Sequence, residues 1–366
     1  MSRSSRGTDP AGAVSAAKRA MALAGHPDAS WSIVLGARVE GPPPLKTDVS
    51  DRLAAALTGR PLLGPVPAVR SVGPDGVAAL RKSFANDPYQ DGGPALRVAL
   101  AGPPSEVVVA AHHGALDGLG LLALLGVVLG SSVSSSARGL GPTGPTRSFA
   151  LTAARRVAEA LLRPPGRIAP ARAPASTAPP GDVLVALDVP AAVGGTAALV
   201  AAAVRAVSAW NGRTGEPAGR MIVAIGASRR PGSDLTMEER SAYLRIGPVP
   251  PTAGEAAVRS LVRSAVPEPA APPVRGLGPL VPAVRALSRR LGSTLLVSNL
   301  GTVTAPGLAS VAFHPVAHGR SGVALGAATV GGATTLTLRA RAEAFDEDGA
   351  MGLLAGVAAE LAGAQR

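Results

Sequence analysis

Apolar residues recur along this chain at two different spacings. Val14, Ala17, Met21 and Ala24 follow one another at helix spacing, whereas Glu106–His113 is a short apolar run of the kind that forms a buried strand. The pattern predicts helices at residues 11–24, 49–58, 78–84, 118–129, 148–162, 196–210, 253–266, 280–291 and 349–364. It predicts strands at residues 31–39, 94–100, 106–113, 182–189, 221–227, 294–298 and 334–342. Both halves mix strands and helices, which is typical of an α/β protein built from two-layer lobes.

Two segments between these elements are rich in proline and small residues. Residues 131–146 are Ser/Gly/Pro-rich, and Pro164–Gly181 is a Pro/Ala stretch. Because proline-rich segments extend and act as semi-rigid spacers, we expect residues 166–181 to link two lobes. The lobes would cover residues 1–165 and 182–366, and no sequence repeat relates them.

Composition limits the kinds of partner. The chain has 366 residues, of which 46% are hydrophobic and 2% aromatic, so its core must consist mainly of Ala, Val and Leu. Its formal net charge is +12, which suits an anionic partner. The arginines are scattered, and two Trp and two Tyr offer few stacking surfaces, so we expect no nucleic-acid binding. Coenzyme A phosphates or an acidic carrier protein fit the charge better.

The chain contains no cysteine. This excludes disulfides, thiolate catalysis and cysteine-ligated zinc, and it fits a cytoplasmic protein. Lys18 and Arg19 interrupt the first apolar stretch, so we expect no signal peptide. The longest apolar run, Leu119–Gly130, is far shorter than the ~20 residues that span a bilayer, so we expect no transmembrane segment.

A pair of histidines stands at the end of the predicted strand 106–113. His112 and His113 are followed by Asp117 and Gly118, which gives the pattern HHxxxDG. Imidazole is the side chain best suited to moving protons near neutral pH. A nearby carboxylate can supply a charge anchor, and a glycine leaves room for substrate. The pattern therefore points to acyl transfer.

Other sites are less well supported. His314 and His318 lie four residues apart, but the neighbouring Pro315 and Gly319 argue against a helix, so we interpret both as loop histidines and expect no metal. Gly118–Gly120 lacks the further residues of a nucleotide-binding loop. The chain has no Gly-x-Ser-x-Gly, which disfavours an α/β-hydrolase.

With the HHxxxDG motif the chain resembles the chloramphenicol acetyltransferase-like superfamily, which includes condensation domains of peptide synthetases, wax ester synthases and polyketide-associated acyltransferases. Supporting segments occur in family order at residues 31–39, 61–63, 94–98, 223–230 and 295–301. The resemblance covers most of residues 30–360, although only the HH motif is specific. It implies two acetyltransferase-like lobes with a tunnel between them.

The resemblance assigns catalytic roles in both halves. His113 would be the general base that takes a proton from the attacking hydroxyl or amine, and His112 would be structural. Ser298 lies where the acetyltransferases place a hydroxyl that stabilises the tetrahedral oxyanion. Asn299 is a second candidate for contact with the oxyanion or the substrate.

The remaining motif residues would shape the site. Asp117 would turn away from the substrate and pair with an arginine, for which Arg229 and Arg230 are the candidates. Gly118 would leave space where donor and acceptor meet.

The chain also departs from familiar members of the superfamily. It lacks the DFGWG segment of the plant acyltransferases, and it is shorter than most condensation domains. We expect an acyltransferase of lipid or secondary-metabolite biosynthesis that moves an acyl group from a CoA or carrier-protein thioester to a small-molecule or lipid alcohol or amine. No tightly bound cofactor is expected. Two alternatives stay open, namely a free-standing condensation protein with carrier-bound donors and an inactive relative that binds a carrier or partner protein.

Overall fold

The protein is described by a computed structural model that covers residues 31–141, 148–172, 180–216, 219–232, 235–269, 292–317 and 319–364. The helices expected at 11–24 and 280–291, as well as His318, lie outside these residues. The strands are β1 (Ser32–Val39), β2 (Val69–Val72), β3 (Leu96–Ala101), β4 (Glu106–His112), β5 (Ser134–Ser135), β6 (Asp182–Val189), β7 (Val223–Ser228), β8 (Ser241–Ile246), β9 (Leu295–Thr304), β10 (Leu308–His314), β11 (Val323–Val330) and β12 (Ala333–Arg341). The helices are α2 (Lys46–Leu57), α3 (Val77–Asn86), α4 (Gly118–Leu129), α5 (Phe149–Leu162), α6 (Thr196–Thr214), α7 (Glu255–Ser264) and α9 (Glu347–Gly363). Two short 3-10 turns, Pro61–Leu63 and Pro74–Gly76, complete the described elements.

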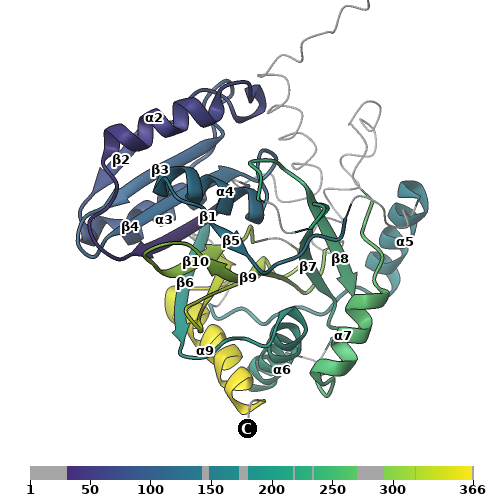
Figure 1. Ribbon diagram of the computed structural model, residues 1–366. Helices are drawn as coiled ribbons and strands as arrows, with labels where there is room; N and C mark the ends of the chain where they lie inside the picture. The colour runs from purple at the N-terminus through teal and green to yellow at the C-terminus, as the bar shows by residue number, and fades with distance from the viewer. Residues whose placement is uncertain are drawn as a thin grey trace, which may run out of the picture.

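Two β-sheets form the frame of the molecule (Figure 1). The first has the strand order β10-β1-β4-β3-β2, and the second has the order β6-β12-β11-β9-β7-β8, with β5 paired to β9. The prediction of an α/β fold is therefore confirmed.

The first sheet is covered by helices on both faces. Ile33 and Leu35 of β1 belong to the core that contains α2 and α4, whereas Val34 packs in the core with α3. Successive side chains of a strand point to opposite faces, so a strand covered on both sides is apolar throughout. This explains why the run from Ser32 to Ala37 is buried without a break.

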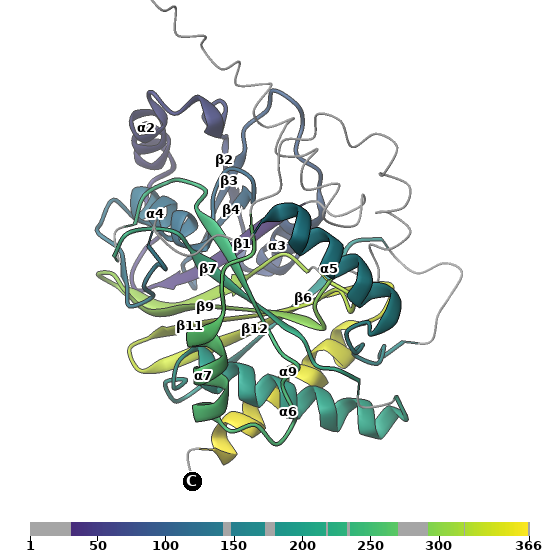
Figure 2. The same cartoon turned by 90° about the vertical axis from the view of Figure 1, so that its right-hand side faces the viewer.

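The second sheet packs one face on α6, α7 and α9. Leu336, Leu338 and Ala340 of β12 share a core with these helices, and Figure 2 shows α6 and α9 side by side beneath the sheet. The other face of β12 carries Thr337 and Arg339, which are fully buried. These polar residues face the first sheet.

A buried arginine of the second half joins the two halves there. Arg339 donates to Asp182 over 2.6 Å, and the two side chains are 0% and 2% exposed. Arg339 also donates to the carbonyl oxygens of Ala85 and Ser32, while Arg341 adds a second ion pair to Asp182 at 3.2 Å. One guanidinium thus ties β12 to α3 and to the start of β1.

The first sheet is completed by a strand from the second half of the chain. β10 runs antiparallel to β1, with Val34 opposite His314. The sequence pattern did not predict β2, β8, β10 or β11. β11 is rich in Ala and Gly, which are poor strand formers, and it is buried throughout, so it lacks the alternation of a half-exposed strand.

The described part of the expected linker is packed against the second half. Ile168 and Ala169 are 3% and 2% exposed. The Ala169 backbone N–H donates to the Asn211 side chain, and its carbonyl accepts from the Trp210 indole over 2.8 Å. The lobe boundaries at 165 and 182 stay a prediction.

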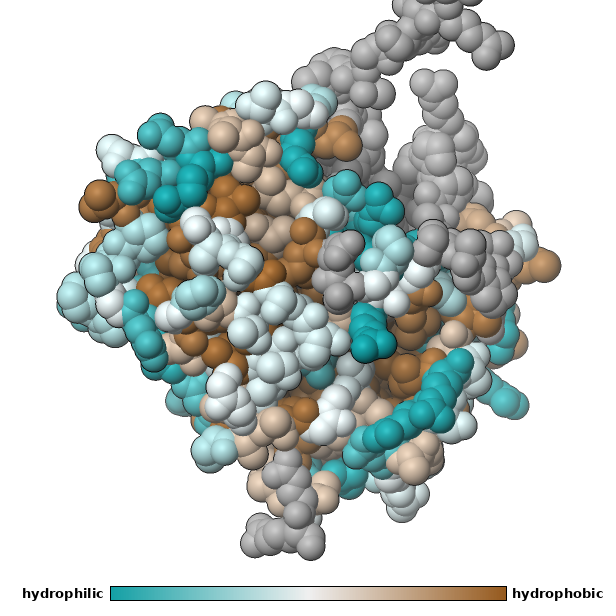
Figure 3. Space-filling view, in the orientation of Figure 1, coloured by the Kyte–Doolittle hydropathy of each residue, from teal (hydrophilic) through white to brown (hydrophobic). Residues whose placement is uncertain are grey.

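Helix α5 lies along the side of the second sheet and exposes apolar residues. Leu151 is 74% exposed and Leu162 is 80% exposed, and Figure 3 shows hydrophobic residues at the right-hand edge, where Figure 1 places α5. In the described ranges, no helix combines the length and the apolar character that crossing a bilayer requires.

Candidate active site between the two sheets

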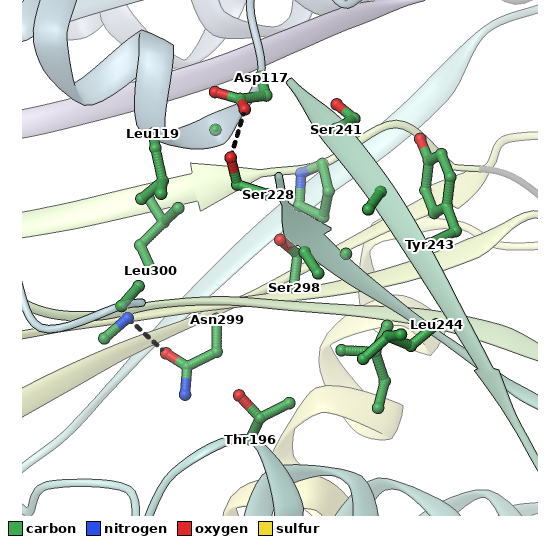
Figure 4. A pocket seen from close by; sticks show the side chains of 18 of the residues that line it. Asp117, Leu119, Thr196, Ser228, Ser241, Tyr243, Leu244, Ser298, Asn299 and Leu300 are labelled. Atoms are coloured by element: carbon green, nitrogen blue, oxygen red, sulfur yellow. Dashed lines mark hydrogen bonds between the residues drawn. The ribbon is translucent and has the colours of Figure 1, made fainter. Parts of the chain in front are cut away.

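A cavity of about 390 Å³ lies where the end of β4 and the start of α4 meet strands β7, β8 and β9. Its lining includes His113 and Gly118 from the first half and Gly226, Tyr243 and Ser298 from the second. Figure 4 shows Tyr243 and Ser298 around this space. The fold therefore brings the HHxxxDG motif and the predicted oxyanion residue to one cavity.

The backbone of the motif is held by the first sheet and by the start of α4. The His112 N–H donates to the Ala95 carbonyl and the His113 N–H to the Trp31 carbonyl, both over 2.8 Å. Asp117 is the N-cap of α4, and its Oδ1 accepts from the Gly120 N–H over 2.7 Å. An aspartate at this position satisfies one of the free N–H groups of the first turn. The strand-to-helix turn is thus fixed at both ends.

His113 is held at both ring nitrogens. Nδ1 lies 3.2 Å from the Leu116 carbonyl oxygen, and Nε2 lies 3.0 Å from the Tyr243 hydroxyl. Because a carbonyl oxygen only accepts, we assign the proton to Nδ1. Nε2 then carries a lone pair and accepts from the Tyr243 hydroxyl. This is the tautomer that a base acting through Nε2 requires.

Tyr243 keeps its proton at neutral pH. Burial of the part of the side chain that is not exposed, together with the charge of Glu239, raises the pKa of this phenol, although 36% of the residue is exposed. Tyr243 was not among the site residues predicted from the sequence, because β8 was not predicted to be a strand. The available signal was its rarity, since the chain has two tyrosines.

His112 lies outside the cavity. It is 2% exposed, and its Nδ1 accepts from the Gly114 N–H over 3.1 Å. Its ring meets Tyr89 edge-on, with 5.4 Å between the ring centroids. Burial raises the pKa of Tyr89 to about 12. The first histidine is part of the core behind the turn.

Asp117 forms a buried ion pair with Arg230. Arg230 donates to Oδ1 over 2.8 Å, and the two side chains are 5% and 2% exposed. Oδ2 accepts from the Ser228 hydroxyl over 3.1 Å, as Figure 4 shows, and from the Arg240 N–H over 3.3 Å. A buried carboxylate needs such partners, because removing a charge from water is costly.

The two candidate arginines point to different places. Arg230 also donates to the carbonyl oxygens of Thr236 and Glu238, over 2.5 and 2.6 Å. Arg229 donates to the Glu268 carbonyl oxygen instead, over 3.3 Å. Of the two candidates, only Arg230 pairs with Asp117.

Ser298 has an uncommitted hydroxyl. Among the described residues, its Oγ has no hydrogen-bond partner, and it lines the cavity on β9. Gly226 of the neighbouring β7 leaves room for it, since a Cβ there would lie 3.0 Å from this Oγ. Asn299 lines the same cavity, but its Oδ1 already accepts from the Gly301 N–H over 2.8 Å.

Gly118 lies at the wall of the cavity, against side chains of the second half. A Cβ there would lie 3.0 Å from Leu300 Cδ2 and 3.1 Å from the Phe313 ring. The absence of a side chain therefore allows α4 to approach β9 and β10. This packing contact is one reason for glycine at position 118. The expected space for substrate is another.

His314 is not a loop residue, which corrects the interpretation from sequence. It is the last residue of β10, which ends before Pro315. It is 1% exposed, because β10 pairs with β1 inside the molecule. Burial, with smaller effects from Arg81 and Arg339, lowers its pKa to about 3, so the ring is neutral. The described residues contain no cluster of three or more His, Asp or Glu side chains suited to a metal ion.

Comparison with known proteins identifies the fold. No protein-family model and no curated protein matches the sequence. The condensation domain of the monacolin K polyketide synthase MokA aligns with a TM-score of 0.55 and 12% identity, over 95% of each chain. The first condensation domain of the calcium-dependent antibiotic synthetase, in complex with a substrate analogue, gives 0.55 and 15% over 96% of this chain and 95% of the other. The X-domain from teicoplanin biosynthesis, solved in complex with OxyB, gives 0.50 and 15% over 100% of this chain and 94% of the other.

The chain shares the two-lobed fold of these condensation domains. The resemblance inferred from the HHxxxDG motif is confirmed at the level of the fold.

Proposed function

We propose that this protein transfers an acyl group from a thioester to a hydroxyl or amine acceptor in secondary-metabolite biosynthesis. The observation that carries the proposal is that one cavity is lined both by His113, whose Nδ1 faces the Leu116 carbonyl oxygen, and by Ser298, whose hydroxyl is uncommitted. The fold supports it, since the similar structures come from a polyketide synthase, an antibiotic synthetase and teicoplanin biosynthesis.

In the proposed reaction, His113 acts as general base. The acceptor O–H or N–H takes the place of the Tyr243 hydroxyl and gives its proton to Nε2 as it attacks the thioester carbonyl carbon. The Ser298 hydroxyl donates to the oxyanion that forms on the carbonyl oxygen. The C–S bond then breaks, and the leaving sulfur takes the proton from His113. The products are an ester or amide and a free thiol, with no covalent enzyme intermediate.

Tyr243 marks the position of the acceptor. Its hydroxyl lies 3.0 Å from Nε2, which is the distance that an attacking hydroxyl needs for proton transfer. Tyr243 stands on the edge strand β8 and is partly exposed. Its side chain can therefore rotate away without opening the core.

Asp117 and Arg230 would position the base without touching the substrate. Their ion pair joins the turn after β4 to the end of β7, so it fixes the first half of the site relative to the second. Leu116, whose carbonyl oxygen orients His113, is the residue next to Asp117.

The proposal is tested by measuring the release of free thiol. The panel combines acyl-CoA and acyl-carrier donors with alcohol and amine acceptors. We expect the wild-type protein to release thiol and to form an acylated acceptor, and the His113→Ala variant to lose at least a hundredfold in rate. Arg259→Ala is the matched control, because Arg259 is exposed on α7 and is not among the residues that line the cavity. Equal thiol release by wild type and His113→Ala across the panel contradicts the proposal.

Two observations favour a second function, the binding of a partner protein without catalysis. Tyr243 occupies the reactive nitrogen of His113, and the similar X-domain was solved bound to another protein. Absence of thiol release, together with retention of a carrier protein on the immobilised chain, supports this second function.

A further inference from the structure

A second cavity, open and about 580 Å³ in volume, lies between α5, β8 and α7. Its polar lining consists mainly of arginines, which come from three parts of the chain. These are Arg155, Arg156 and Arg163 on or next to α5, Arg220 before β7, and Arg245 on β8. We call these five residues the arginine cluster.

The arginine cluster carries more positive charge than its partners neutralise. Glu159, at its centre, pairs with Arg156 at 2.8 Å, with Arg245 at 2.9 Å and with Arg220 at 3.3 Å. Among the described residues, Glu268 forms an ion pair only with Arg156. Five guanidinium groups against these two carboxylates leave an excess of three positive charges.

Two members of the cluster have no carboxylate partner. Neither Arg155 nor Arg163 forms an ion pair with any described residue, although both line the cavity. Their guanidinium groups are therefore available to a ligand. Arginine binds phosphate groups through paired N–H donors, which suits an anionic ester with several oxygens.

Part of the positive charge of the arginine cluster is also shielded from solvent. The Arg245 side chain is 11% exposed, and burial together with the neighbouring Arg156 lowers its pKa to about 10, so it stays a cation at neutral pH. Like charges held together in a concave surface focus a positive potential that attracts anions. An anion in this cavity would offset the repulsion.

The arginine cluster is next to the site at His113. Tyr243 and Arg245 lie two residues apart on β8, so they share one face of the strand at a spacing of about 7 Å along it. Neighbouring residues of α7, Leu261 and Val262, line the second and the first cavity, respectively. A single extended ligand along β8 would reach both cavities.

We propose that the arginine cluster binds the phosphate ester at the charged end of the thioester donor, whose acyl end lies at His113. This inference rests on the proposed function. The shared chemistry is a pantetheine arm that carries a phosphate. Such an arm is part of free acyl-CoA and also of a carrier protein with its prosthetic group.

Binding can be measured without catalysis, by calorimetry at low ionic strength with 4′-phosphopantetheine and with pantetheine, which lacks the phosphate. We expect wild type to bind the phosphorylated arm at least tenfold more tightly than pantetheine and to lose this preference at high salt. The Arg155→Ala/Arg163→Ala variant should lose at least tenfold in affinity for 4′-phosphopantetheine and keep its affinity for pantetheine. These substitutions leave the ion pairs of Glu159 intact.

The control is Arg213→Ala/Arg259→Ala, which removes the same charge from exposed sites on α6 and α7. It should bind 4′-phosphopantetheine as wild type does. Equal affinity for the two arms, or equal losses in the two double variants, overturns the inference. Phosphate-dependent binding without any thiol release would support the cluster as a phosphate site and count against the proposed reaction.

The source of the phosphate is decided by two further ligands, coenzyme A and a carrier protein bearing the prosthetic arm. If the binding of either ligand depends on Arg155 and Arg163, the inference is supported and that ligand is identified as the donor type. If neither shows this dependence, the cluster does not serve the donor.

Discussion

The Tyr243 hydroxyl donates a hydrogen bond to Nε2 of His113 over 3.0 Å, although 130 residues separate them. The opposite ring nitrogen faces the Leu116 carbonyl oxygen, which leaves Nε2 as the acceptor. The base of the proposed reaction is therefore oriented, and a phenol already occupies the place that an acceptor hydroxyl needs.

Removing this phenol should help the acceptor to bind. We expect Tyr243→Phe to lower the acceptor KM severalfold while kcat stays within about threefold of wild type, because the variant abolishes a competing hydrogen bond but leaves His113 in place. Steady-state kinetics with a varied acceptor measure both constants. A collapse of kcat comparable to that of His113→Ala would instead show that the phenol takes part in the chemical step.

Ser298→Ala should reduce kcat about 10²- to 10³-fold with little change in KM, the loss typical of a missing oxyanion donor. The hydroxyl has no other hydrogen-bond partner among the described residues, so stability should change little. Ser310→Ala is the control, because the Ser310 hydroxyl accepts from Arg38 on the surface. Unchanged kcat in Ser298→Ala rules out the role of this hydroxyl.

Asp117→Ala should lower the free energy of unfolding by about 3–5 kcal/mol, because it leaves the buried guanidinium of Arg230 without its charge partner. Urea denaturation measures the loss, and activity should fall with it. Asp188→Ala is the control, since the Asp188–Arg38 pair is about half exposed and Asp188 otherwise accepts only from the Thr335 hydroxyl among the described residues, so the loss should be smaller, about 1–2 kcal/mol. Full stability combined with complete loss of turnover would contradict a positioning role for Asp117.

His314 should make the protein sensitive to mild acid. Its folded-state pKa of about 3 lies below the value of 6.5 for a free histidine, so the unfolded chain binds a proton that the folded chain does not. Stability linked to this residue is therefore present above pH 6.5 and is lost as the pH falls from 6.5 towards 3.

Between pH 7 and pH 5 we expect this residue to cost about 2 kcal/mol of unfolding free energy. In His314→Asn, which cannot titrate, that part of the pH dependence should disappear, whatever the variant's stability at pH 7. Urea denaturation of both proteins at the two pH values measures the difference. Parallel losses in the two proteins would show that other groups cause the acid sensitivity.

Much of the local structure follows from the sequence. The predicted bounds of α4, residues 118–129, and of β6, residues 182–189, coincide with those in the structure. The bounds of α4 are determined by neighbouring residues, since Asp117 caps this helix and Gly130 ends it in the left-handed conformation. The α/β class and the HHxxxDG motif at a strand-to-helix turn were visible for the same reason.

Strands defined by distant partners were harder to predict. β10 is a strand because it pairs with β1, and its place in the first sheet depends on a register between segments far apart in the chain. No periodicity within residues 308–314 expresses that pairing.

The sequence by itself determined the α/β class, the strand and helix on either side of the motif, and His113 as the candidate base. The tertiary structure alone decided that Arg230 rather than Arg229 meets Asp117, and that Tyr243 meets Nε2 of His113. The physical reason is the range of the interactions. Capping and periodic burial act between residues within a few turns, whereas these contacts form only after two sheets have packed against each other.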